Sequence, residues 1–171
     1  MILTTDDIWQ ANLRYFKHWK IVKEAKPDIK LIAFVVANYN NEGEINKSEE
    51  FNKWYEENKD WVEIGVHGYD HLKPQEGWRS REEQKENFGK AIEILKPYLP
   101  DKFLVRFPGF RFLPYSEKIV RELGASGVAH QEVIKYFNGE LIQPVFNTHC
   151  CDGDPNIIVN PITKVWKNLI M

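Results

Sequence analysis

The sequence predicts an α/β fold built on a largely parallel sheet. Apolar runs of strand length alternate with polar, helix-like segments, which is typical of consecutive strand–helix units. The run 30–39 is almost without polar residues, as expected for a strand that is covered on both faces. The chain has 171 residues, 43% of them hydrophobic, which is enough for one substantial core and too little for two. We therefore expect a single domain over residues 1–171.

Each element of the first half follows from a local pattern. Apolar spacing predicts an amphipathic helix over 8–24, and the residues "SREE" at 80–83 have the form of a capping box, so a long helix is expected to begin at Ser80. In chain order we expect strands and helices alternately, over 1–5, 8–24, 30–39, 48–58, 61–68 and from Ser80 to about residue 95.

The second half is richer in strands. A fourth strand with its exit loop is expected over 102–111, and a short helix over 116–123 that Gly124 ends. Strands then follow at 127–131, 133–137 and 140–149; the last two are joined by Asn138–Gly139, a strong hairpin-turn signal. A last helix is expected over 162–170.

The charge balance argues against a nucleic-acid partner. Lys and Arg total 23 against 25 Asp and Glu, so the net charge of −2 provides none of the basic field on which nucleic-acid binding depends. Cys150 and Cys151 are adjacent, which is a poor geometry for a structural disulfide. The sequence shows no leader pattern and no long apolar run, so we expect a cytoplasmic protein without membrane contact.

Polar, reactive side chains follow several of the expected strands. Asp6–Asp7 end the first strand, His67 and His71 follow the third, Arg106 the fourth, and His149 the late strand. Each has an ordinary alternative, since aspartates cap helices, arginines form surface ion pairs and histidines four apart arise by chance. Because the carboxyl ends of parallel strands face the same side, their joint placement favours one site.

His67, His71 and one of the aspartates form a ligand set for a divalent metal. Neutral imidazole and carboxylate are the usual ligands of catalytic zinc, and three protein ligands leave one position open for water. Such an ion lowers the pKa of its water towards about 7 and polarises a carbonyl. The second aspartate is then free to act as a base. We expect zinc, with cobalt, nickel, manganese or iron as alternatives.

Four short motifs resemble those of the polysaccharide deacetylases, the NodB-homology or carbohydrate esterase family 4 enzymes. They are "TTDD" at 4–7, "HGYDH" at 67–71, "RFPGFR" at 106–111 and "NTHC" at 147–150. The resemblance implies a distorted (β/α) barrel that uses a divalent metal to remove N-acetyl groups from chitin, peptidoglycan or a related saccharide. Since a full barrel has about 250 residues, we expect an incomplete barrel with an open groove.

The resemblance also assigns roles by position. It makes Asp6 the general base and Asp7 the metal-binding aspartate. His67 and His71 match the two metal-binding histidines of the family, and Arg106 matches the arginine that holds the base in place.

The remaining roles concern the acetyl group and the leaving amine. His149 matches the histidine that acts as general acid, and the backbone N–H of Gly109 or Phe110 corresponds to the group that stabilises the oxyanion. In the implied reaction Asp6 removes a proton as water attacks, and His149 protonates the departing amine.

The chain departs from the family pattern at several positions. Gly68 replaces the Ser or Thr that follows the first histidine, which removes a side chain that would brace the loop. The family has an apolar residue two positions before the last histidine, and this chain has Asn147 there, since 147–149 reads Asn-Thr-His. The family's fourth motif, an Asp-rich stretch with a Trp, has no counterpart, and Glu132 or His130 is the nearest substitute.

Three further residues are candidates for contact with substrate. Asn38 and Tyr39 leave the second strand on the expected active face, where their side chains can reach sugar hydroxyls. Trp78, in the loop after the histidine pair, offers a stacking surface for a sugar ring, with simple packing as the alternative.

Three functions are open on this evidence. The leading one is a metal-dependent hydrolase that deacetylates an N-acetylated saccharide. A second keeps the metal and changes the substrate to a non-sugar amide or another C–N bond. A third is a carbohydrate-binding protein with a decayed site.

Overall fold

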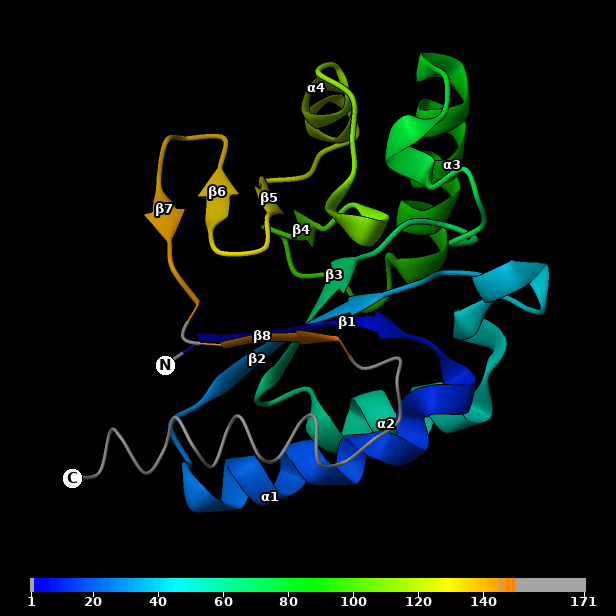
Figure 1. The fold of residues 1–171 in the computed structure, drawn as a ribbon. Coiled ribbons are helices and arrows are strands. Elements are labelled where there is room, and N and C mark those ends of the chain that lie inside the picture. The colour runs from blue at the N-terminus through cyan, green and yellow to red at the C-terminus, as the bar shows by residue number, and fades with distance from the viewer. Residues whose placement is uncertain (1, 145, 150–171) are drawn as a thin grey trace.

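The computed structural model describes residues 2–144 and 146–149. Its strands form one eight-stranded sheet in the order β7-β6-β5-β4-β3-β2-β1-β8 (Figure 1). Neighbouring strands from β8 through β1 to β5 are parallel, and β5, β6 and β7 are antiparallel. The strands are β1 (Ile2–Ile8), β2 (Lys30–Val35), β3 (Val62–Val66), β4 (Leu104–Val105), β5 (Gly127–Ala129), β6 (Ile134–Tyr136), β7 (Leu141–Ile142) and β8 (Phe146–His149).

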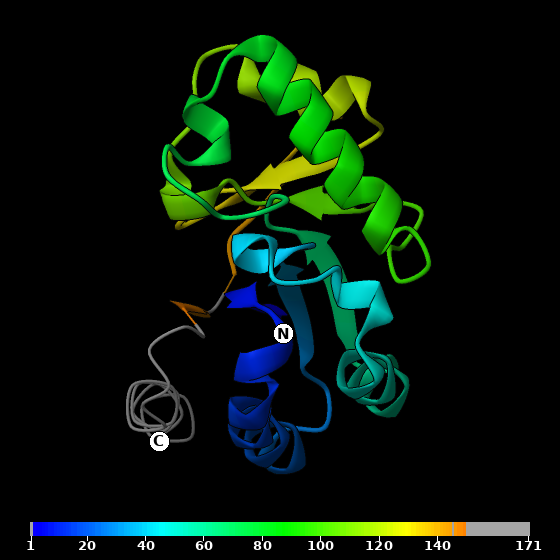
Figure 2. The ribbon, with the colours of Figure 1, turned by 90° about the vertical axis from the view of Figure 1, so that its right-hand side faces the viewer.

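Helices cover the outer side of this sheet. In Figures 1 and 2, α1 and α2 lie against one half of the sheet, and α3 and α4 against the other. The α-helices are α1 (Lys17–Ala25), α2 (Glu49–Asn58), α3 (Arg81–Leu95) and α4 (Ser116–Glu122). Short 3-10 helices are η1 (Gln10–Phe16), η2 (Tyr39–Asn41), η3 (Ile45–Lys47), η4 (Glu76–Trp78) and η5 (Pro108–Phe110). The architecture is an incomplete (β/α) barrel, which confirms the predicted fold class.

Strand β2 shows why its sequence is almost without polar residues. Leu31, Ala33 and Val35 belong to the large core between the sheet and the helices. Ile32 and Phe34 point the other way and form a smaller cluster on the inner side of the sheet. Because successive side chains of a strand alternate between faces, a strand covered on both must be apolar throughout.

Several local predictions are confirmed. Ser80 caps α3 in a complete capping box with Glu83, and Ser48 caps α2 through a bond from the Phe51 N–H. Gly124 follows α4 with a φ of 97°, a left-handed conformation that glycine adopts without a steric cost.

The predicted first strand and first helix are wrong in their bounds. Strand β1 does not stop at residue 5 but continues through Asp6–Asp7 to Ile8. The chain then forms a 3-10 helix over 10–16 before α1 begins at Lys17. The pairing of β1 with β2 shifts between Thr5 and Ile8, so a bulge lets the strand extend past the two aspartates.

The predicted strand 140–149 is two strands at opposite edges of the sheet. The hairpin at Asn138–Gly139 joins β6 to β7 as expected, but β7 ends at Ile142. Pro144 then interrupts the ladder because proline has no N–H to donate. Strand β8 pairs with β1, so the segment ends beside Asp6. The helix predicted over 162–170 and the pair Cys150–Cys151 lie outside the described residues.

In the described part of the chain, no helix combines the length and apolar character needed to cross a membrane.

Candidate active site

The two aspartates of β1 lie in the bulge of that strand. Asp6 and Asp7 are 1% and 8% exposed, and Asp7 has a φ of 55°. Consecutive residues of a regular strand point to opposite faces, whereas the bulge and the left-handed turn at Asp7 redirect its side chain. As a result both carboxylates lie at the carboxyl end of β1, with different partners.

Asp7 meets the two histidines of the loop after β3. Its Oδ1 lies 3.0 Å from His67 Nε2 and 2.8 Å from His71 Nε2. One ligand atom from each of the three side chains falls within 4.8 Å of the others, an arrangement that can hold a metal ion. The structure thus brings together the three residues predicted as metal ligands.

The hydrogen bonding of His67 tests whether this cluster suits a cation. His67 Nδ1 lies 2.9 Å from the carbonyl oxygen of Arg106, which can only accept, so Nδ1 carries the proton. In the neutral ring Nε2 is then a bare acceptor that faces the Asp7 carboxylate. Two acceptors 3.0 Å apart repel each other unless a proton or a metal ion lies between them. A backbone carbonyl behind a metal-binding imidazole is also the common arrangement in metal sites.

Charge in the cluster is consistent with this view. Burial acts to raise the pKa of Asp7, but the hydrogen bonds and charges of His67 and His71 outweigh it and hold that pKa well below its usual range. Burial acts to lower the pKa of His71, and the bond and charge of Asp7 outweigh it, so that pKa is raised. The carboxylate is therefore ionised and favours positive charge on His71.

The second carboxylate is held by a buried arginine. Arg106 is 0% exposed; one terminal nitrogen lies 3.4 Å from Asp6 Oδ2, and the other donates to Thr4 Oγ1 at 2.8 Å. The guanidinium also lies 4.2 Å from the ring centroid of Phe34 and 5.4 Å from that of Phe110. Burial lowers the pKa of Arg106 to about 10, partly offset by Asp6, so the group stays charged at neutral pH.

The position of Phe34 depends on a glycine in the next strand. A Cβ on Gly65 would lie 2.6 Å from the Phe34 ring and 3.2 Å from the Leu104 carbonyl oxygen. Only a residue without a side chain therefore lets β3 pass this ring. Gly65 thus secures the surface on which the Arg106 guanidinium rests.

A buried glutamate that sequence reasoning missed organises the histidine loop. Glu76 is 0% exposed, and its Oε1 accepts from the backbone N–H groups of residues 69, 70 and 71 at 2.9, 3.0 and 2.9 Å. A Cβ on Gly68 would lie 2.6 Å from the same oxygen, and Gly68 has a φ of 86°. The carboxylate of Glu76 thus braces the loop from a place that a side chain at position 68 would block.

A bidentate ion pair fixes the next part of this loop. Arg79 donates to both oxygens of Asp70, at 2.7 and 3.1 Å, and also to the carbonyl oxygens of Leu72 and Pro74. Asp70 in turn accepts from the Leu72 N–H. The segment from His71 to Pro74 is therefore held at both ends by polar contacts, of which those to the Leu72 and Pro74 carbonyl oxygens are exposed.

Aromatic rings line one side of the metal cluster. Tyr39 stacks on Trp9 with ring centroids 4.3 Å apart and lies 5.9 Å from the ring of His71. The side chain of Asn38 is engaged within the protein, since it donates to the Tyr69 hydroxyl and accepts from the Gly43 N–H. Tyr39 and the unpredicted Trp9 thus form the wall, and a sugar contact by Asn38 stays a prediction.

The loop after β4 carries the two candidate oxyanion donors. Gly109 and Phe110 have φ values of 61° and 54°, so the chain makes a tight left-handed turn there. The Phe110 N–H donates to the Phe107 carbonyl oxygen at 2.9 Å. We therefore retain Gly109 as the better of the two candidates for a contact with substrate.

The predicted general acid lies in β8. The backbone of His149, the last residue of β8, is opposite Asp6 in the β1–β8 register, so the two residues lie on neighbouring strands. The side chain of His149 lies outside the part of the chain that the structure describes. Two residues were considered for the fourth motif. Of these, His130 has its Nε2 3.4 Å from Glu117 Oε1, and Glu132 is exposed.

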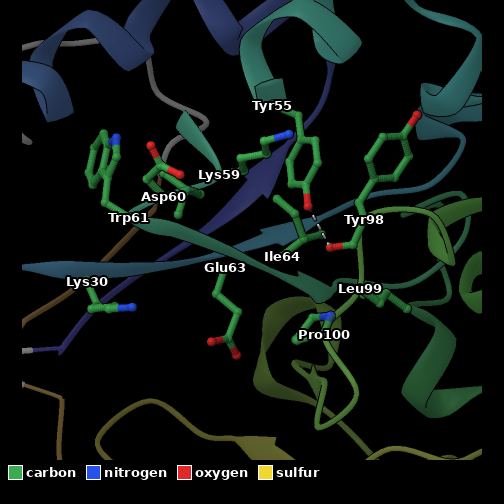
Figure 3. A pocket seen from close by; sticks show the side chains of 11 residues that line it. Lys30, Tyr55, Lys59, Asp60, Trp61, Glu63, Ile64, Tyr98, Leu99 and Pro100 are labelled. Atoms are coloured by element: carbon green, nitrogen blue, oxygen red, sulfur yellow. Dashed lines mark hydrogen bonds between the residues drawn. The ribbon is translucent and has the colours of Figure 1, made fainter. Parts of the chain in front are cut away.

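Two hollows differ in their relation to this cluster. One of about 410 Å³ is lined by residues of the loops after β3 and β4, including Trp78, which is 54% exposed. The other, of about 230 Å³, lies where β2 and β3 begin and is lined by Lys30, Trp61 and Glu63 among others (Figure 3). In (β/α) barrels catalysis occurs at the carboxyl ends of the strands. The first hollow is therefore the one that adjoins the candidate site.

Among known proteins, this chain is similar to solved structures but to no family model and no curated sequence. No protein-family model matches this sequence, and no curated protein matches it. A CE4 family pseudoenzyme from Bacillus anthracis superposes with a TM-score of 0.63 at 17% identity, over 98% of this chain and 61% of its own. The fold is that of the CE4 deacetylases.

Two further structures carry the name of an activity. A deacetylase from Streptococcus pyogenes, solved with acetate, has a TM-score of 0.59 at 18% identity, over 92% of this chain and 67% of its own. The catalytic domain of a peptidoglycan N-acetylglucosamine deacetylase from Eubacterium rectale has a TM-score of 0.60 at 15% identity, over 98% and 83%. At these identities the likeness concerns the fold.

The same fold holds both active and inactive sites. The Bacillus anthracis pseudoenzyme has a mutant with restored enzymatic activity. This chain spans 61% of the length of that pseudoenzyme. Individual side chains, rather than the fold, must therefore decide the activity.

Proposed function

We propose that this chain is a divalent-metal-dependent hydrolase that removes an N-acetyl group from an amino-sugar substrate. One observation carries the proposal: ligand atoms of Asp7, His67 and His71 converge within 4.8 Å, and a second buried carboxylate, Asp6, precedes Asp7 in the same strand. A site that only binds a metal has no need of a second carboxylate tied to a buried arginine.

The roles of the protein groups follow from their positions. A divalent ion held by Asp7, His67 and His71 would supply Lewis acidity towards a water molecule and an acetyl carbonyl. We propose zinc, with cobalt, nickel, manganese and iron as alternatives, because nitrogen and carboxylate ligands accept all of them. Asp6 takes the proton of the attacking water, and Arg106 keeps that carboxylate oriented.

The acetyl group and the amine need two further groups. The Gly109 N–H donates to the carbonyl oxygen as negative charge develops on it. His149 gives a proton to the amide nitrogen as the C–N bond breaks, so that the products are acetate and a neutral amine. Tyr39 and Trp9 form an aromatic wall against which the acetyl methyl or the sugar face can pack.

The alternatives differ in outcome rather than in fold. A hydrolase of a non-sugar amide or other C–N bond would keep the metal and the base. A carbohydrate-binding protein with a decayed site is suggested by the pseudoenzyme of the same fold. The presence of Asp6, Asp7, His67 and His71 together argues against decay.

Metal content and acetate release separate these functions. We expect bound metal and acetate released from chitin oligomers or peptidoglycan fragments. Metal without acetate would favour the non-sugar hydrolase, and absence of both would favour the decayed site.

Two substitutions test the individual roles. Asp6→Asn should abolish turnover and leave the metal content nearly unchanged, whereas His71→Ala should lose both. Asp101→Asn is the matched control for Asp6→Asn, because Asp101 is exposed, and we expect it to retain metal and activity. Equal loss of metal in Asp6→Asn and His71→Ala would refute the division into base and ligand.

A further inference from the structure

The hollow next to the candidate metal cluster has a distinctive lining. Its residues are Lys73, Pro74, Gln75, Trp78, Gly109 and Arg111. Two of them are cationic, one is an exposed tryptophan, and none is acidic. With a volume of about 410 Å³, it has room for a ligand of sugar size.

The two cations are available to a ligand. Among the described residues, no carboxylate lies within ion-pair distance of Lys73 or Arg111. Arg79 and Arg106, the other arginines of this region, are paired with Asp70 and Asp6 at 2.7 and 3.4 Å. The charges of Arg79 and Arg106 are thus balanced by ion pairs within the protein, whereas no ion pair of this kind balances the charge of Arg111 among the described residues.

The tryptophan orients the arginine. The guanidinium carbon of Arg111 lies 5.5 Å from the ring centroid of Trp78. Stacking of this kind holds a guanidinium in place while leaving its N–H donors free for a planar anion. A sugar ring can pack on the exposed part of Trp78 at the same time.

The backbones under the hollow are closely packed. The Leu113 N–H donates to the Gly77 carbonyl oxygen at 2.9 Å, and a Cβ on Gly77 would lie 2.1 Å from the Arg111 carbonyl oxygen. The backbones of η4 and of the loop after η5 therefore pack directly against each other. The backbone that carries Trp78 and Arg111 is therefore in place before a ligand binds, which limits the entropy cost to the side chains.

The hollow adjoins the metal cluster through the chain itself. Lys73 is two residues from His71, so their Cα atoms lie within about 7 Å of each other. Gly109, the proposed oxyanion donor, lines the hollow as well. A ligand with its acetyl group at the metal would therefore extend its next unit into this space.

We propose that this hollow is a subsite for a carboxylate-bearing sugar joined to the N-acetylated one, so that an acidic saccharide is preferred over a neutral one such as chitin. This inference rests on the proposed function for the position of the acetyl group. The carboxylate can come from a uronic acid or from a lactyl ether, since the chemistry presented to Arg111 and Lys73 is the same.

A pair of matched oligosaccharides tests the charge directly. The first is a tetrasaccharide of alternating N-acetylglucosamine and glucuronic acid, and the second is the same molecule with its carboxyl groups reduced to alcohols. A tetrasaccharide that contains the lactyl ether in place of the uronic acid distinguishes the two sources. The dissociation constants are measured by calorimetry, and the KM values by acetate release.

We expect the charged tetrasaccharide to bind about tenfold more tightly than its reduced form, and the preference to shrink in high salt. Arg111→Gln should bring the preference below about threefold, and Lys73→Gln should reduce it as well. Arg121→Gln is the matched control, because Arg121 is also exposed and lies over an aromatic ring, that of Phe137. It should leave the preference unchanged.

The results separate this inference from the proposed function. Equal affinity of wild type for the charged and reduced forms, or a preference that survives Arg111→Gln together with Lys73→Gln, would overturn the subsite. A charge preference that Arg111→Gln removes, in a protein that releases no acetate from either tetrasaccharide, would support the subsite and count against the deacetylase.

Discussion

Replacement of Glu76 tests how the histidine loop is built. In Glu76→Ala the backbone N–H groups of residues 69, 70 and 71 lose the oxygen that now accepts all three at 2.9 to 3.0 Å. Each unsatisfied buried donor costs about 1–3 kcal/mol. Because the loop can relax and admit water, we expect a total loss of about 3–5 kcal/mol in the free energy of unfolding.

Glu76→Gln separates loss of shape from loss of charge. The amide oxygen of Gln can accept the same three N–H groups, but neutral hydrogen bonds are about half as strong as charged ones. We therefore expect a smaller loss, about 1–2 kcal/mol. Metal affinity should fall about 10- to 100-fold in Glu76→Ala, since the residue acts on His71 as an outer partner of a ligand.

The measurements are urea unfolding of the metal-free protein and a metal titration monitored by calorimetry. Glu24→Ala is the control, because Glu24 is exposed near the end of α1. Our account of the loop would fail if Glu76→Ala matched Glu24→Ala within about 0.5 kcal/mol, the usual range for a surface change, and bound metal as wild type does.

Three other substitutions test close packing and burial. Gly68→Ala should lower the free energy of unfolding by about 2–4 kcal/mol, since its Cβ would lie 2.6 Å from Glu76 Oε1 at a φ of 86°. Measured by urea unfolding, the same substitution should cost less in the Glu76→Ala variant, which lacks this carboxylate. Gly65→Ala should cost about 2–3 kcal/mol by displacing Phe34, again by urea unfolding. Burial raises the pKa of Glu63, so the folded protein favours the protonated side chain. The stability that the protonated form contributes is present below 4.5, the pKa of the unfolded chain, and is lost as the pH rises. Glu63→Gln should therefore raise the Tm at pH 7 by about 1–3 °C and give no gain below pH 4.5.

Each of these has a clear contrary result. Additive costs of Gly68→Ala and Glu76→Ala would show that the two positions do not compete for space. A neutral Gly65→Ala would mean that the ring of Phe34 moves freely. A Tm gain from Glu63→Gln that is the same at all pH values would assign the effect to something other than its charge.

Regular patterns made much of the fold predictable. The alternation of apolar runs with helical segments predicts strand–helix units because burial of strand and helix faces imposes different periods on the sequence. The capping box at Ser80 and the turn at Asn138–Gly139 are local interactions between residues a few positions apart. Because such interactions involve residues close together in the sequence, they can be recognised there, and both were predicted correctly.

The positions of strands within the sheet were not predictable in the same way. Residues 140–149 have the composition of one strand, yet β7 pairs with β6 at one edge and β8 with β1 at the other. The pairing of β8 with β1 joins residues more than a hundred positions apart, such as Leu3 and Phe146. Such contacts leave no periodic trace along a single sequence.

The sequence by itself determined which reactive side chains stand near the carboxyl ends of the strands: Asp6–Asp7, His67, His71 and Arg106 are visible behind or at the end of apolar runs. Only the tertiary structure decided that the bulge at Asp7 directs one carboxylate to the histidines and leaves Asp6 beside Arg106. It also placed Glu76 under the histidine loop. The physical reason is that differences of a few tenths of an ångström decide whether two atoms form a hydrogen bond or clash. The order of residues alone does not contain such distances.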